Sequence, residues 1–158
     1  MANFYTLVTT AGQVKLASAL ATGLPLQITQ MAVGDGNGNP VVPTEGRTAL
    51  VRESYRASLN TLKTDATNPN YMIAELVVPM GTGGFTVREV GLFDVDNTLI
   101  AYGNFPDTYK PLLTEGAGRE LVVRMIFQVA NASTVQLKID PTVVLATRAW
   151  VEIGRAHV

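Results

Sequence analysis

The sequence predicts an α+β fold made mainly of antiparallel β-sheets or a sandwich, with a short helix at each end. Three observations predict it. Short apolar or alternating runs are separated by clusters of glycine, proline and asparagine, as in strands joined by tight turns. Apolar residues follow helical spacing only near the two ends of the chain. No internal repeat or low-complexity tract is present, so we expect one main domain.

Composition supports this class and narrows the function. A chain of 158 residues with 47% hydrophobic residues is long enough for one sizeable core. Twelve basic and 13 acidic residues give a net charge of -1, which disfavours nucleic acid and anionic membranes as partners. The absence of cysteine excludes disulfides, a thiolate nucleophile and cysteine-ligated zinc. With no signal peptide and no long apolar run, we expect a soluble chain that is not exported.

The first half begins with a helix predicted at about 10–22. Thr10 and Gln13 fit a capping box, and Gly23 is a plausible stop. The run LQITQMAV, residues 26–33, suits a strand that ends at a glycine cluster. Residues 54–64 alternate in polarity and are predicted to form a hairpin with YMIAELVVP around the turn ATNPN.

In the second half, FTVREVGLFD and TLIAYGNF are predicted to form another hairpin around a short turn. Residues 106–118 are predicted to form a long ordered loop, and residues 119–129 and 134–140 a further strand pair. About seven strands are expected in all. From Pro141 the spacing becomes helical, and four residues occupy a and d positions of two heptads, namely Val143, Ala146, Trp150 and Ile153.

The stretch GDGNGNP, residues 34–40, could be a metal loop, a phosphate loop or a turn. A calcium loop needs glycine at its sixth position and glutamate at its twelfth, where this chain has Pro40 and Gly46. A phosphate loop fails too, because no Lys-Ser/Thr follows and Pro40 lacks an amide donor. We therefore interpret Gly34, Asp35 and Gly36 as turn-formers that need positive φ angles or cap amides.

Catalytic groups are sparse. The one histidine, His157, lies near the chain end, so a histidine-based triad or metal site has no anchored centre. Arg88 and Glu89 are neighbours in a predicted strand and should point to opposite faces. An inward-facing member would need a charged or hydrogen-bonded partner, and we favour a structural ion pair over a catalytic acid. Residues 109–111 could contact a ligand, but anchoring of the loop is the favoured interpretation.

Several segments together resemble a known family. They are the opening TTAG helix, MAVGDGNG, AELVVP, GGFTVREVGLFDVDNTLIA, TYKP, EGAGR and ATRAWV, which span about residues 4–152. In this combination the chain resembles the amino-terminal domain of the phage tail-collar fibre family of Mu-like contractile-tailed phages and R-type pyocins. The resemblance implies a structural virion protein that attaches a tail fibre to the baseplate and is not an enzyme. It also implies that the protein is assembled in the host cytoplasm. It implies no cofactor or metal, and no nucleic acid, membrane or small-molecule substrate as a partner.

The resemblance also assigns regions. Residues 1–142 would form the attachment domain, and residues 143–158 a helix or linker toward a fibre shaft. The chain stops after WVEIGRAHV, so we interpret it as a piece of a fibre or a short adaptor, with a vector origin as one explanation for GRAHV. The matching positions are carried over as architectural or interface residues, namely Gly34, Asp35, Gly36, Arg88, Glu89, Gly91, Asp94, Tyr109, Lys110 and Pro111.

Two further expectations concern partners. The full-length fibre would self-associate as a trimer, but two heptads are too few to hold three helices together in water, so we expect this chain to be monomeric or weakly associated. The alternative function is a carbohydrate-binding β-sandwich module that uses the glycine loop with Tyr102 or Tyr109. Exposed aromatic platforms would favour that alternative, whereas most aromatics here fall in apolar strand or helix patterns.

Overall fold

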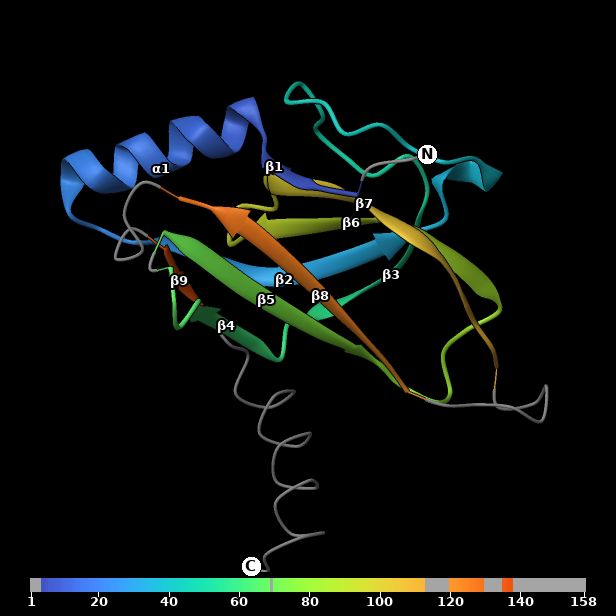
Figure 1. Cartoon of the computed structure of the whole chain (residues 1–158). Coiled ribbons are helices and arrows are strands. Elements are labelled where there is room, and N and C mark those ends of the chain that lie inside the picture. The colour runs from blue at the N-terminus through green and yellow to red at the C-terminus, as the bar shows by residue number, and fades with distance from the viewer. Residues whose placement is uncertain (1–3, 69, 113–119, 130–134, 138–158) are drawn as a thin grey trace, which may run out of the picture.

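The structure, a computed structural model, describes residues 4–68, 70–112, 120–129 and 135–137 (Figure 1). These residues form two β-sheets, a helix at the edge of the sheets and a long covering loop. The prediction of mainly antiparallel sheets with one short amino-terminal helix is confirmed. The elements are β1 (Thr6–Val8), α1 (Thr10–Thr22), β2 (Leu26–Gly34), the 3-10 turn η1 (Gly36–Gly38), β3 (Glu53–Ser58), β4 (Thr61–Thr64), β5 (Tyr71–Val78), β6 (Phe85–Asp94), β7 (Leu99–Lys110), β8 (Leu121–Gln128) and β9 (Val135–Leu137).

The larger sheet has six strands and the smaller has three. The order in the larger sheet is β1-β7-β6-β2-β3, with β9 parallel to the start of β2. The smaller sheet has the order β4-β5-β8 and is antiparallel throughout. In Figure 1 the smaller sheet crosses in front of the larger one. The arrangement is a sandwich whose sheets differ in size.

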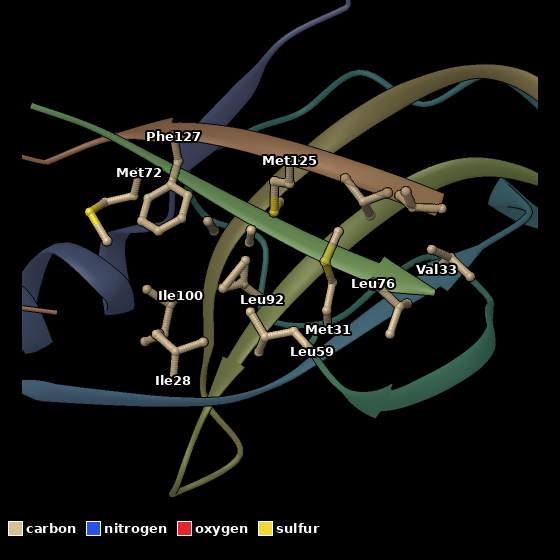
Figure 2. Packing of buried hydrophobic residues seen from close by; sticks show 14 of the residues in the cluster. Ile28, Met31, Val33, Leu59, Met72, Leu76, Leu92, Ile100, Met125 and Phe127 are labelled. Atoms are coloured by element: carbon tan, nitrogen blue, oxygen red, sulfur yellow. The ribbon is translucent and has the colours of Figure 1, made fainter. Parts of the chain in front are cut away.

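The main core lies between the two sheets, as Figure 2 shows. Alternate residues of β5 are buried, because successive side chains of a strand point to opposite faces. Met72 and Leu76 of β5 thereby meet Phe127 of β8 and Leu92 of β6. Full burial of aliphatic side chains such as these contributes roughly 1.5–3 kcal/mol each, so this interface is the main source of stability.

A second, smaller cluster lies on the opposite face of the six-stranded sheet. It contains Ala32, Leu50, Phe93, Leu99 and Tyr102, with Val41 packed against it. Its cover is the long connection between η1 and β3, which contributes the buried Leu50. The six-stranded sheet is therefore buried on both faces, by a sheet on one side and by a loop on the other.

Helix α1 begins and ends through local capping. The hydroxyl of Thr9 accepts a hydrogen bond from Gly12 N at 2.9 Å, which makes Thr9 the N-cap. The predicted capping box of Thr10 and Gln13 is therefore wrong, because the N-cap is one residue earlier and Gly12 stands where a capping box needs Glu or Gln. Gly23 has φ 76° and closes the helix as predicted. Gly12 permits contact with β7, since a Cβ there would lie 2.2 Å from the carbonyl oxygen of Ile100.

The alternating segment of residues 54–64 is not one strand. Its first part, β3, pairs with β2 in the larger sheet, and its second part, β4, pairs with β5 in the smaller sheet. The chain changes sheet at Leu59, which is fully buried, and Asn60, whose side chain accepts a hydrogen bond from Val77 N at 2.9 Å. The predicted hairpin with YMIAELVVP is thus correct only for β4 and β5.

Two other expectations need correction. Strand β7 continues to Lys110, so the first part of the predicted loop is strand that pairs with the start of β6. Strands β8 and β9 do not pair, because β8 joins β5 and β9 joins β2. The β6–β7 hairpin is confirmed. The predicted carboxyl-terminal helix, with Val143, Ala146, Trp150 and Ile153, lies outside the described residues.

Candidate protein-interaction site

The turn after β2 is shaped by close backbone approach. A Cβ on Gly34 would lie 2.3 Å from the carbonyl oxygen of Arg52 and 2.4 Å from Oε2 of Glu89. No side chain fits in that space. The next residues turn sharply, with φ 65° at Gly36, 56° at Asn37 and 86° at Gly38, the left-handed region that glycine and asparagine tolerate best.

Asp35 acts inside this turn rather than as a metal ligand. Its Oδ1 accepts a hydrogen bond from Asn37 N at 2.8 Å and another from Arg52 Nε at 2.9 Å. The hydrogen bond from Arg52 is the main reason that the pKa of Asp35 lies below its usual value. In the described part of the chain, no three His, Cys, Asp or Glu side chains group around a common point.

Glu89 is the centre of the site. Its side chain is fully buried, and its carboxylate accepts hydrogen bonds from Val51 N at 2.8 Å, Arg52 N at 2.9 Å and Gly36 N at 3.2 Å. The hydroxyl of Tyr102 donates a further bond at 2.6 Å. We call these contacts the Glu89 clamp. It fastens both ends of the long loop to β6.

The clamp corrects one expectation and explains the state of Tyr102. Arg88 and Glu89 were expected to point to opposite faces, but both side chains reach the same turn, Arg88 at the Asp35 carbonyl and Glu89 at Gly36 N, beside a shift in the β6–β7 register. None of the ion pairs among the described residues includes Glu89. Hydrogen-bond donors replace the expected cation. Burial, followed by the hydrogen bond to Glu89, raises the pKa of Tyr102 well above its ordinary value. Tyr102 therefore remains a protonated donor at any physiological pH.

Arg88 connects the turn with β7. Its Nη1 donates to the carbonyl oxygen of Asp35 at 3.0 Å, and its Nε donates to Asp107 at 3.3 Å. Arg52, whose side chain is 60% exposed, forms a salt bridge with Asp35. We call this region the loop end of the six-stranded sheet, and it consists of Asp35, Asn37, Arg52, Arg88 and Asp107. It brings together the glycine turn and the segment predicted as a second loop.

Tyr109, Lys110 and Pro111 lie next to the loop end, where β7 finishes. Lys110 is 1% exposed, and its Nζ donates to the carbonyl oxygens of Thr82 at 2.6 Å and Pro111 at 3.1 Å. Lys110 thus ties the chain before β6 to the end of β7. Tyr109 points outward and is 52% exposed.

Gly91 and Asp94 serve other parts of β6. A Cβ on Gly91 would lie 2.6 Å from Leu50 and 2.8 Å from Leu99, so glycine lets the loop pack against the sheet. Oδ1 of Asp94 accepts bonds from Asp96 N at 3.0 Å and Thr98 N at 2.9 Å. Its Oδ2 accepts no hydrogen bond, but Lys15 Nζ lies 2.9 Å away as an ionic partner. Asp94 therefore shapes the β6–β7 turn, far along β6 from Glu89.

Sequence reasoning missed Arg52 and the role of Tyr102. Backbone amides give no sequence signal, so the acceptor role of Glu89 toward residues 51 and 52 could not be predicted. Tyr102 carried a usable signal, because the β6–β7 register pairs Gly91 with Tyr102 and so places Tyr102 diagonal to Glu89 on the same face.

Comparison with known proteins identifies the family. Residues 1–149 match the family described as phage tail-collar fibre protein, N-terminal. The chain belongs to the phage tail-collar fibre family. It is also 49% identical over 150 residues to a probable tail fiber protein of Escherichia phage P2, a match that covers 94% of this chain and 22% of that protein. No solved structure matches the chain.

The family membership makes this tail-collar domain a structural component of a phage virion. The chain spans about a fifth of the length of the P2 relative, which is 22% covered. None of the helices among the described residues is long and apolar enough to cross a membrane.

Proposed function

We propose that this domain attaches a tail fibre to the baseplate of a contractile tail, and that the loop end of the six-stranded sheet makes the contact. The domain would act as a binding module without catalysis. Family membership supports attachment by the amino-terminal part of a fibre. The Glu89 clamp supports the choice of surface, because a loop held at both ends loses little conformational freedom on binding.

The loop end also offers suitable anchors. Val42, in the covering loop, is 76% exposed, and Tyr109, two residues after Asp107 in β7, is 52% exposed. The side chains of Arg52 and Arg88 at the loop end are partly exposed as well. Aromatic and arginine side chains commonly dominate the binding energy of protein interfaces. A fibre must stay attached under mechanical load, so we expect an interface of on the order of 1,000 Å² or more.

The test is competition. The purified chain should bind fibreless tails, block the joining of full-length fibres and leave host cells unbound. Val42→Asp and Tyr109→Ala should each weaken binding to tails by about tenfold or more, the cost of losing an interface anchor.

Val95→Asp is the matched control. Val95 is 49% exposed in the β6–β7 turn, at the other end of that hairpin, and its substitution should leave binding unchanged. Equal effects at Val42 and Val95 would move the contact away from the loop end.

A carbohydrate-binding module is the second candidate. Tyr102 cannot present a sugar platform because it is fully buried, whereas the exposed Tyr109 keeps this candidate open. Binding of the chain to host cells or glycans, with no association to tails, would favour it over attachment.

The full-length fibre is further proposed to be a trimer of this chain's parent protein. The expected monomeric or weakly associated state of the chain itself is checked by sedimentation at micromolar concentration. A stable trimer there would place a trimer interface in the globular domain.

A further inference from the structure

The chain joins the two sheets on one side, and on the other side the edge strands of the two sheets lie close to each other without pairing. On the joined side the chain passes directly from β3 to β4 through Leu59 and Asn60. On the other side, β1 is the last strand of the larger sheet and β8 the last strand of the smaller one. We call the space between β1 and β8 the seam.

The backbone of β8 presents unused hydrogen-bonding groups to the seam. Val129 N donates to the carbonyl oxygen of Asn70 at 2.8 Å. Together with the β5–β8 register, this bond shows which residues of β8 direct their backbone groups toward β5. Backbone groups alternate sides along an antiparallel strand, so the odd-numbered residues of β8 face β5. The groups that face away from β5, and that have no backbone partner in the described part of the chain, belong to Val122, Arg124, Ile126 and Gln128.

Strand β1 borders the seam in the same way. Thr9 N donates to Ile100 O, and Asn104 N donates to Tyr5 O, so the odd-numbered residues face β7. Thr6 and Val8 therefore direct their backbone groups away from the sheet. The Val8 carbonyl accepts one bond from the Gln13 side chain at 3.1 Å.

A cavity of about 690 Å³ opens at this place. Its walls come from β1, a mostly exposed side of α1 and the end of β8, together with Glu45 and Asn70, and they mix aliphatic and polar residues. The apolar lining residues include Leu7, Val8, Leu16, Leu20 and Val129.

Apart from the charge of Arg124, strand β8 lacks the features that usually protect an edge strand. It has no proline, no lysine and no irregularity in its register with β5. Its outward side chains include Val122 and Ile126, which are 53% and 47% exposed. The opposite edge, β4, has only four residues and carries Lys63, as expected for a protected edge.

We propose that the seam binds an extended segment of a partner protein, which adds to β8 as a further strand and places alternate aliphatic side chains in the cavity. Arg124 specifies a further property of that segment. Its side chain is 60% exposed and pairs with Glu75 on β5 at 2.6 Å, so an acidic residue on the added strand opposite Arg124 would complete its coordination. The partner strand therefore combines aliphatic residues with one acidic residue.

A second copy of this chain fits the seam less well. If β8 paired antiparallel with β8 of another copy, outward residues would have to face outward residues. Two such registers overlap most. In one, Arg124 lies directly opposite Arg124 of the other copy, and in the second the two arginines are diagonal neighbours. Like charges in these positions destabilise strand pairing. The proposal does not depend on attachment to the baseplate.

The test uses a synthetic peptide as long as β8, with alternating valine and threonine and a glutamate placed to face Arg124. Amide exchange is followed by NMR in the full chain. The peptide should slow exchange at Val122, Arg124 and Ile126 by about tenfold or more, as for newly bonded strand amides. The amide of Thr64 on the β4 edge should be unaffected.

Two variants separate the seam from general effects. Ile126→Pro removes an amide that faces away from β5 and should abolish peptide binding. Ile126→Lys keeps this amide and should weaken binding, because it adds a charge to the edge strand. Thr64→Pro is the matched control. Because Asp65 N bonds to β5, the amide of its neighbour Thr64 faces away from β5, so this substitution also removes an outward amide, but on β4. This variant should bind the peptide normally. The proposal is wrong if the unaltered chain shows no protection, or if an N-methylated peptide binds equally well.

Discussion

The two faces of the six-stranded sheet are buried by different means. The inner face packs against the three-stranded sheet through many aliphatic contacts. The outer face carries only a small apolar cluster, and the loop that covers it is fastened by the carboxylate of Glu89. The inner face therefore depends on summed apolar area, whereas the cover of the outer face is held by a limited set of mainly polar contacts, of which Glu89 makes the most.

This difference has a consequence for tolerance to substitution. A core of many similar contacts loses stability in proportion to the volume removed at each site. A hydrogen-bonded clamp instead fails as a unit, because each donor left without an acceptor pays its own desolvation cost. Substitutions at the two faces should thus differ in which segments unfold first, and also in how much they lower the free energy of unfolding.

The largest effect is expected for Glu89→Ala. It leaves three backbone donors and the Tyr102 hydroxyl without their acceptor, and should lower the free energy of unfolding by about 3 kcal/mol. Amide exchange should show the loop 36–52 opening before the sheets do. Leu76→Ala is the matched inner-face variant and should speed exchange throughout both sheets. Equal protection patterns in the two variants would contradict the comparison.

Tyr102→Phe sharpens the same comparison, because it removes one donor and keeps the ring. We expect a loss of about 1 kcal/mol, measured by denaturant unfolding. A loss as large as that of Glu89→Ala would show that the single bond from the Tyr102 hydroxyl, and not the set of backbone donors, accounts for the effect of Glu89.

Acid should loosen the loop end in a smaller step. The folded state lowers the pKa of Asp35, chiefly through the hydrogen bond from Arg52. The resulting stability is present above the unfolded pKa of about 4 and is lost as the pH falls through the lower folded value. Because Arg52 is largely exposed, the contribution should be at most about 1 kcal/mol. In Arg52→Ala this acid-dependent part should shrink, while Lys63→Ala should retain it.

Calcium should have no effect at all. In the turn of residues 34–40, the carboxylate of Asp35 already accepts hydrogen bonds from Asn37 N and from the Arg52 side chain. Thermal unfolding with millimolar calcium and with a chelator should give the same midpoint. A rise of several degrees with calcium would reveal binding to the folded state.

The strands could be predicted from the sequence because their signal is local. Strand-like runs beside turn clusters identified β5 and β8, and turn residues identified the β6–β7 hairpin. The passage from β3 to β4 could not be predicted, because alternation continues across residues 54–64 while the pairing partner changes at Leu59. Likewise, the pairing of β9 with the start of β2 joins segments far apart in the sequence, which no local pattern records.

The candidate site divides in the same way. The turn at Gly36 and the end of α1 at Gly23 could be predicted because each needs a positive φ angle. The burial of Glu89 and Lys110 could not, since their partners are mainly backbone groups and charged side chains usually face water. Glu89 was predicted to lie in a strand but not to face inward, and Lys110 was predicted to lie in a loop.

Because Glu89 binds Gly36 at one end of the loop and Val51 and Arg52 at the other, it works as a noncovalent cross-link. The entropy of closing a flexible loop grows only logarithmically with its length, and doubling the length costs about 0.6 kcal/mol. Residues can therefore be inserted between the two fixed ends at little cost to folding where they spare the packed Val41 and Leu50 and the Glu45 carbonyl that accepts a bond from Thr10 N. The loop end can change its reach and chemistry while the sheet beneath it stays the same.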